Sequence, residues 1–178
     1  MSATAEYIER LEALKEGERS RLRRLAGMPL DETLAGFDLF TGLWWPLRDR
    51  SRAAPRRETS WLVAKLYGMS PIPHLPSDPA RQTELAAILG RCEPKDERGR
   101  ARYRGKFDAL LCSSLSGIEP HLRWALSVAA SAVRTAKPQG LDWVRLLDDL
   151  SIWDRGEEHS RKLDIRDIWA ELYLRNSL

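Results

Sequence analysis

The sequence is poor in the residues that most often hold metals or build disulfide scaffolds. It contains two cysteines, Cys92 and Cys112, and three histidines, none of them at the spacing of a zinc site. Two isolated cysteines also provide no disulfide framework and are typical of free thiols in a reducing cytosol. We therefore expect neither a metal nor another cofactor.

Long apolar runs are missing as well. No segment approaches the roughly 18 consecutive apolar residues of a transmembrane helix. The N-terminal stretch is acidic and lacks the basic region and apolar run of a signal peptide. We therefore expect a cytoplasmic protein that is neither exported nor membrane-spanning.

The alternation of apolar and polar residues that marks a half-buried strand does not occur. Apolar residues instead recur at intervals of three and four, as in the stripe Leu122, Leu126, Ala129 and Val133. A chain of 178 residues, 43% of them hydrophobic, can bury one sizeable core or at most two small helical lobes. The sequence predicts an all-α bundle of about seven to nine helices that forms one domain over residues 1–178. If there are two lobes, their seam is expected near residues 70–79, in a proline-rich connection.

Two local signals predict helix starts. Asp78 is followed by Pro79, so a carboxylate can accept free amides while proline occupies the first helical position. Ser116 and Glu119 stand three residues apart before an apolar stripe, the pattern of a reciprocal capping box.

Catalytic signals are weak. The sequence has no phosphate-binding glycine loop, nucleophile elbow or dinucleotide fingerprint. One dense carboxylate group could bind the metal ions of a nuclease, but helical spacing favours a solvated acidic face. This acidic group comprises Asp148, Asp149, Asp154, Glu157 and Glu158. We expect a binding protein and not an enzyme, with a metal-dependent nuclease as an alternative.

Positive charge gathers in two windows, each with a net charge of +4: residues 48–65 and 91–106. Residues 141–178 carry a net charge of −3, so the chain is polarised although its overall charge is only +3. Clustered arginines are typical of surfaces that meet phosphates, because guanidinium groups match phosphate oxygens and each contact releases counterions. A solvated face that only keeps the protein soluble is the alternative. Eight candidates for phosphate contact rest on charge alone: Arg50, Arg52, Arg56, Arg57, Lys65, Arg98, Arg102 and Arg104.

Helical spacing refines these candidates in one place. Arg98, Arg102 and Lys106 recur every four residues, so they share one face of a predicted helix and form a basic ridge. Helical stripes assign most of the seven tryptophans to the core. Trp45 and Trp124 lie off their stripes and are candidates for a subunit interface or for stacking on a base.

Several segments together carry a resemblance to a known family. They are LKEGERSRLRRLAG (residues 14–27), LGR (89–91), KFDALL (106–111), HLRWAL (121–126), LDWVRLLDDLSIWD (141–154) and WAELY (169–173). In their order and spacing they resemble the CasB family, the small subunit of the type I-E CRISPR surveillance complex, Cascade. The resemblance runs over nearly the whole chain.

The resemblance implies an all-helical, non-enzymatic subunit that sits in Cascade as a head-to-tail pair. Its partners would be a second copy of itself, the crRNA-bearing backbone subunits, the large subunit, the crRNA and the target DNA. Its basic surface would hold the target strand paired to crRNA and keep the displaced strand apart. The exchange of a DNA duplex for an RNA–DNA hybrid is nearly balanced, so contacts to the backbone can tip it without reading sequence. Four residues match positions where the family pattern is basic: Arg24, Arg91, Lys106 and Arg123.

The sequence departs from the family pattern in two places. The turn at residues 48–57 is richer in arginine than the family pattern, which leaves its phosphate role open. The final motif ends in Leu172 and Tyr173, where an aromatic pair is usual. A function of another class also stays open: a helical protein-interaction adaptor whose basic patches bind acidic protein partners.

Overall fold

The computed structural model describes residues 1–29, 34–50, 54–135, 139–154 and 164–177. Within these ranges the chain forms nine α-helices and no strand, which confirms the all-α prediction. The helices are α1 (Ala3–Glu12), α2 (Glu16–Arg24), α3 (Leu34–Arg50), α4 (Arg57–Met69), α5 (Leu85–Arg91), α6 (Glu97–Cys112), α7 (Glu119–Thr135), α8 (Trp143–Ser151) and α9 (Ile165–Asn176).

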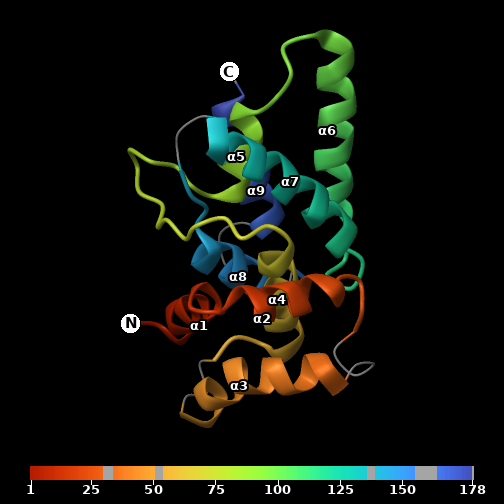
Figure 1. Ribbon diagram of the computed structural model, residues 1–178. Coiled ribbons are helices and arrows are strands. Elements are labelled where there is room, and N and C mark those ends of the chain that lie inside the picture. The colour runs from red at the N-terminus through yellow and green to blue at the C-terminus, as the bar shows by residue number, and fades with distance from the viewer. Residues whose placement is uncertain (30–33, 51–53, 136–138, 155–163, 178) are drawn as a thin grey trace.

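The helices gather in two groups (Figure 1). Helices α1 to α4 lie together, with α2 packed on α4 and α1 on α3. In the other group α5 packs against α9 and α7, and α6 runs along one side in contact with α7 and α9. Helix α8 lies against α1 and α4 of the first group. Helix α4 also contacts α7, which joins the first group to the second.

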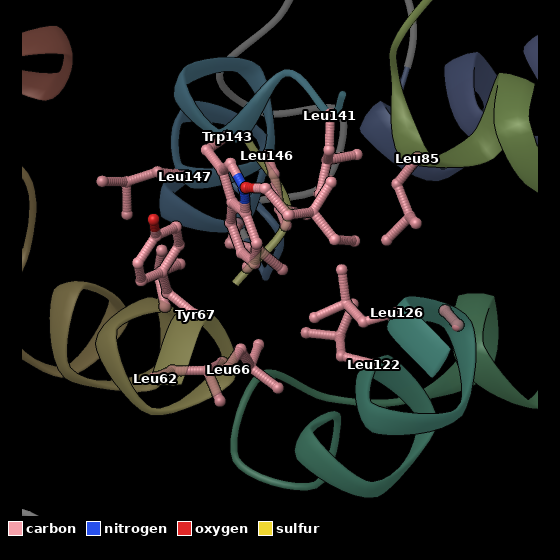
Figure 2. Packing of buried hydrophobic residues seen from close by; sticks show 14 of the residues in the cluster. Leu62, Leu66, Tyr67, Leu85, Leu122, Leu126, Leu141, Trp143, Leu146 and Leu147 are labelled. Atoms are coloured by element: carbon pink, nitrogen blue, oxygen red, sulfur yellow. The ribbon is translucent and has the colours of Figure 1, made fainter. Parts of the chain in front are cut away.

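A continuous set of buried side chains fills the boundary between the two groups (Figure 2). Leu66 and Tyr67 of α4 face Leu122 of α7 and Trp143 of α8 around a common centre. Trp143 is fully buried, its ring meets that of Tyr67 edge-on at 5.3 Å, and its indole N–H donates to the Ile72 carbonyl at 2.7 Å. The hydrophobic core therefore extends from one group of helices into the other.

The proline-rich connection at residues 70–79 is attached to the segment before α8. The amide of Leu75 donates to the Leu141 carbonyl at 3.0 Å, and the amide of Leu141 donates to the Pro73 carbonyl at 3.0 Å. The two segments lie so close together that a Cβ on Gly140 would be 2.8 Å from the Pro73 carbonyl oxygen, so glycine is required at this position. The division of the chain into lobes at this connection stays a prediction.

The predicted helix start at Asp78 is wrong. The Asp78 carboxylate does accept the amides of Ala80 and Arg81, both at 2.8 Å, but it caps only a single turn. Helix α5 begins at Leu85. Thr83 explains the delay: its hydroxyl donates to the Leu75 carbonyl at 2.7 Å and fixes the segment before it as a closed loop.

The predicted capping box is also wrong. Glu119 is the first residue of α7 and not its third. It accepts the amide of Gly27 at 2.6 Å and the ammonium of Lys65 at 2.7 Å. The hydroxyl of Ser116 instead pairs with that of Ser114 at 3.0 Å. A buried ammonium needs an opposite charge more than a helix end needs a local cap, because an unpaired buried charge costs several kcal/mol, roughly 3–5.

Asp149 contradicts the solvated acidic face. Its side chain is only 8% exposed, accepts the indole N–H of Trp169 at 2.8 Å and pairs with Arg145 at 2.9 Å. Asp148 accepts the hydroxyl of Thr4 at 2.9 Å, and Asp154 accepts the amide of Leu115 at 3.1 Å. Glu157 and Glu158 lie outside the described residues. The described carboxylates of this group thus tie α8 and the turn after it to neighbouring segments.

Candidate nucleic-acid interface

Helix α6 is held along one side and presents the other side to solvent. Its N-terminus is capped by Asp96, whose carboxylate accepts the amide of Gly99 at 2.6 Å. The ring of Tyr103 meets Trp124 of α7 edge-on at 5.2 Å, and Phe107 stacks on Tyr173 of α9 at 4.2 Å. These contacts fix the rotation of α6 about its own axis and therefore decide where its basic side chains lie.

One flank of α6 carries the three cations Arg98, Arg102 and Lys106, here called the α6 ridge. All three side chains are exposed, as helical spacing predicts. No carboxylate among the described residues pairs with any of them. The Lys106 ammonium lies 5.7 Å from the centre of the Trp124 ring, so the C-terminal end of the ridge lies against α7.

The opposite flank of α6 is charge-compensated. The Arg104 guanidinium donates two hydrogen bonds to Glu93, each of 2.9 Å, and the Arg100 Nε lies 3.3 Å from the same carboxylate. Tyr173 donates its hydroxyl to Glu93 as well. The bonds from Arg104 hold the pKa of Glu93 below its usual range, so this carboxylate stays ionised although its side chain is only 5% exposed. Arg104, a candidate from charge alone, is therefore a partner of Glu93.

Helix α7 forms a wall beside α6. A hollow of about 560 Å³, here called the α6–α7 groove, lies along α7 and reaches Tyr103 of α6 and Cys92 after α5. Its lining residues are Cys92, Tyr103, Ser127, Val128, Ser131, Ala132 and Thr135. Ser127, Ser131 and Thr135 continue a four-residue spacing that begins at the exposed Arg123. The sequence reasoning missed this hydroxyl stripe, although a small polar residue at every fourth position of α7 was visible in the sequence.

The four residues that match the basic family positions do not all have the same surroundings. Lys106 belongs to the α6 ridge, and Arg123 lies exposed next to Trp124. Arg24 is exposed at the end of α2 and donates to the Ser20 carbonyl of its own helix at 3.4 Å. Arg91 donates to Asn176 at 2.9 Å and to the Gln82 carbonyl at 2.6 Å, so its guanidinium links α5, α9 and the preceding loop.

Comparison with known proteins identifies the family. Residues 18–173 match the family model described as CRISPR-associated protein Cse2. The chain belongs to the Cse2/CasB family. This family supplies the small subunit of type I-E Cascade, which confirms the resemblance seen in the sequence. It is a family of structural, generally non-catalytic subunits. None of the curated proteins compared matches the sequence.

Solved structures agree with this assignment. A CRISPR-associated protein of the Cse2 family from Thermus thermophilus has a TM-score of 0.66 at 26% identity, covering 97% of this chain and 98% of its own. A structure of CasB from Thermus thermophilus gives a TM-score of 0.66 at 25% identity, with coverage of 97% and 98%. CasB from M. ruber gives a TM-score of 0.70 at 19% identity, with coverage of 98% and 94%, and supports the fold alone.

The second arginine window of this Cse2-family chain lies at a different place from α6. Its first residues end α3, which lies at the end of the molecule away from the upper part of α6 (Figure 1), and its last residues belong to α4. Arg50 pairs with Glu6 of α1, and Arg57 lies 3.9 Å from Glu58. Arg56 is exposed at the start of α4, and Arg52 is outside the described residues. The two windows therefore do not merge into one surface.

Lys65 is used inside the Cse2 fold. Its side chain is 4% exposed, and its ammonium binds Glu119 at 2.7 Å and the Met28 carbonyl at 3.0 Å. The ammonium also lies 5.6 Å from the centre of the Trp61 ring. In this conformation Lys65 has no access to a phosphate, because solvent itself hardly reaches it.

The two tryptophans that lie off their stripes differ in exposure. Trp124 is half-buried between Tyr103 and Lys106. Trp45 is 56% exposed and touches Trp44 with a ring-centre distance of 6.2 Å. Among the described residues there is no group of three or more histidines, cysteines and carboxylates that could hold a metal ion. Within the same part of the chain, no helix is long and apolar enough to cross a membrane.

Proposed function

We propose that this Cse2-family subunit binds nucleic-acid backbone along the α6–α7 groove. Through this contact it holds the target strand paired to crRNA and keeps the displaced strand apart. The observation that carries the proposal is the α6 ridge, three exposed cations with no carboxylate partner among the described residues. Tyr103, which follows Arg102 on α6, lines the neighbouring groove, and the α7 side of that groove consists mainly of small side chains. Phosphates can approach such a surface closely, and no base needs to be read.

The length of the ridge suits this role. Arg98 and Lys106 are eight residues apart on a helix, which corresponds to about 12 Å along its axis. One strand of B-DNA presents a phosphate about every 3.4 Å along its axis, so three or four phosphates fall within this length. Arg123 and Arg24 lie exposed near the start of α7, where the Glu119 contact to Gly27 joins α2 to α7. We propose that they bind further phosphates beyond the ridge.

The other parts of the proposal follow from Cascade membership. The neighbouring Cascade subunits and a second copy of this chain are the proposed protein partners, and the cytoplasm is the proposed compartment. We propose no catalytic activity for the chain, since Asp148, Asp149 and Asp154 bind groups inside the fold. Arg56 and Arg57 of the second window stay candidates for a separate phosphate contact.

Binding of the isolated protein tests the proposal. We expect weak, sequence-indifferent binding to labelled duplex and single-stranded oligonucleotides, measured by fluorescence anisotropy at several salt concentrations. The double variant Arg102→Gln/Lys106→Gln should reduce the slope of log K against log salt by about 1.4 to 1.8, because each lost phosphate contact contributes about 0.7 to 0.9. Arg81→Gln/Arg175→Gln removes the same charge from exposed residues outside the groove and should leave the slope unchanged. A wild-type slope near zero would refute the proposal.

A protein-interaction adaptor is the second candidate, favoured by the exposed indole of Trp45. Reversal of charge at Arg24, Lys106 and Arg123 within the assembled complex separates the two functions. Loss of R-loop formation with assembly intact supports backbone binding. Loss of assembly, with R-loop formation normal in the complexes that still form, supports the adaptor.

A further inference from the structure

Helix α6 carries five basic residues, but its two flanks differ in what surrounds them. The ridge flank has three cations with no carboxylate partner among the described residues. On the other flank Arg100 and Arg104 are about half exposed, with side-chain exposures of 45% and 50%. Arg104 donates two hydrogen bonds to Glu93, whereas Arg100 lies 3.3 Å from Glu93 and donates to the Lys95 carbonyl at 2.9 Å. The exposure of Arg104 means that a phosphate could reach it if Glu93 did not hold it.

Glu93 is well placed to hold these arginines against a competing anion. The Glu93 side chain is only 5% exposed. Solvent and ions therefore have little access to the Glu93 end of its ion pair with Arg104. Tyr173 of α9 donates its hydroxyl to the same carboxylate and fixes it from the core side. The two hydrogen bonds from Arg104 form a bidentate pair, the geometry that guanidinium groups otherwise offer to phosphate. A nucleic-acid strand would therefore have to displace both hydrogen bonds between Arg104 and Glu93 before Arg104 could bind a phosphate.

Two more carboxylates lie near this flank. Glu97 and Asp108 are exposed; helical spacing places Glu97 one turn before Arg100 and Asp108 one turn after Arg104. Together with Glu93 they give the flank three negative charges against two positive ones. The two sides of a single helix therefore present opposite fields to a polyanion, although the sequence window as a whole has a net charge of +4.

We infer that Glu93 determines the path of the nucleic acid on α6 by withholding Arg104 from phosphate and, together with the Lys95 carbonyl, by withholding Arg100. The strand then follows the α6 ridge alone, and Glu93 acts as a positioning residue that fixes the width of the bound surface. This inference rests on the proposed backbone binding. It adds that a carboxylate, and not only the cations, decides which face of α6 meets the strand.

Replacement of the carboxylate by its neutral amide tests the inference. Glu93→Gln keeps the shape and an oxygen acceptor but removes the charge, so the Arg104 guanidinium becomes available to phosphate, while Arg100 keeps its hydrogen bond to the Lys95 carbonyl. We expect tighter binding of a labelled single-stranded oligonucleotide at low salt and a salt slope that is steeper by about 0.7 for each additional phosphate bound. The matched control is Glu97→Gln in the first turn of α6, which changes net charge by the same amount four residues along the chain; no ion pair of Glu97 is found among the described residues. Circular dichroism checks that both variants remain folded.

A second measurement keeps the inference testable if Glu93→Gln does not fold. In the wild-type background, Arg100→Gln/Arg104→Gln should leave the salt slope unchanged, whereas Arg98→Gln/Arg102→Gln should lower it by about 1.4. Equal slopes for Glu93→Gln and Glu97→Gln, or equal losses for the two arginine pairs, would overturn the role of Glu93 while wild-type binding still stands. Absence of wild-type binding would instead remove the proposed function itself.

Discussion

Asp149 has its carboxylate beneath the surface of the fold, between α8 and α9. Burial raises its pKa to about 6, although Arg145 and the Trp169 indole act in the opposite direction. The folded state therefore binds this proton more tightly than the unfolded chain does. It follows that the stability contributed by Asp149 is greatest below about pH 4, falls as the pH rises through about 6, and is constant above that.

The variant Asp149→Asn should lose this dependence. Asparagine keeps an oxygen for the Trp169 indole and carries no charge to desolvate. The difference in unfolding free energy between variant and wild type should therefore shift in favour of the variant by up to about 3 kcal/mol between pH 4 and pH 7. Urea unfolding at four pH values measures it. Asp167→Asn, at an exposed position of α9, is the control, and a difference that stays flat with pH would contradict the prediction.

At the scale of elements, α5 and α9 approach each other more closely than side chains allow. A Cβ added to Gly90 would overlap the Tyr173 carbonyl oxygen and would lie 3.0 Å from the Cβ of Asn176. Because the obstruction is backbone, it cannot move without separating the two helices. Gly105 lies on α6 with nothing within 4 Å of the same added atom.

These two glycines give opposite predictions for the same substitution. Gly90→Ala should lower the unfolding free energy by about 1–3 kcal/mol through overpacking. Gly105→Ala should raise it by about 0.5–1 kcal/mol, since alanine favours an open helical position. Chemical denaturation of both variants measures the contrast, and equal effects at the two sites would show that α5 and α9 are not in close contact.

The elements also show how far sequence reasoning reaches. Helical stripes such as Leu122 to Val133 located the helices because local periodicity reports the buried face directly. The capping box failed because the partner of Glu119 is Lys65, 54 residues away, and no local pattern reveals such a partner. The same limit applies to the candidate site. The ridge was visible in the spacing of Arg98, Arg102 and Lys106, whereas the pairing of Arg104 with Glu93 depends on tertiary contacts.

For the whole molecule, the shared core across the boundary of the two helix groups leads to a further prediction. Since Trp143 packs on Tyr67 and binds the Ile72 carbonyl, neither group can unfold without exposing buried side chains of the other. We expect one cooperative thermal transition, with calorimetric and van't Hoff enthalpies that agree. Differential scanning calorimetry tests this. Two resolved transitions would show that residues 70–79 separate independent lobes.

The pairing of α5 with α9 has a consequence for synthesis. The two helices are the most extensively packed pair among the described elements, yet more than 70 residues of chain lie between the end of the first and the start of the second. While the chain emerges from the ribosome, α5 lacks the cover that α9 gives it around Gly90 until α9 has been made. Translation products that stop before residue 165 should therefore leave the α9-facing surface of α5 exposed and be degraded. Only chains that include α9 would then be available for assembly.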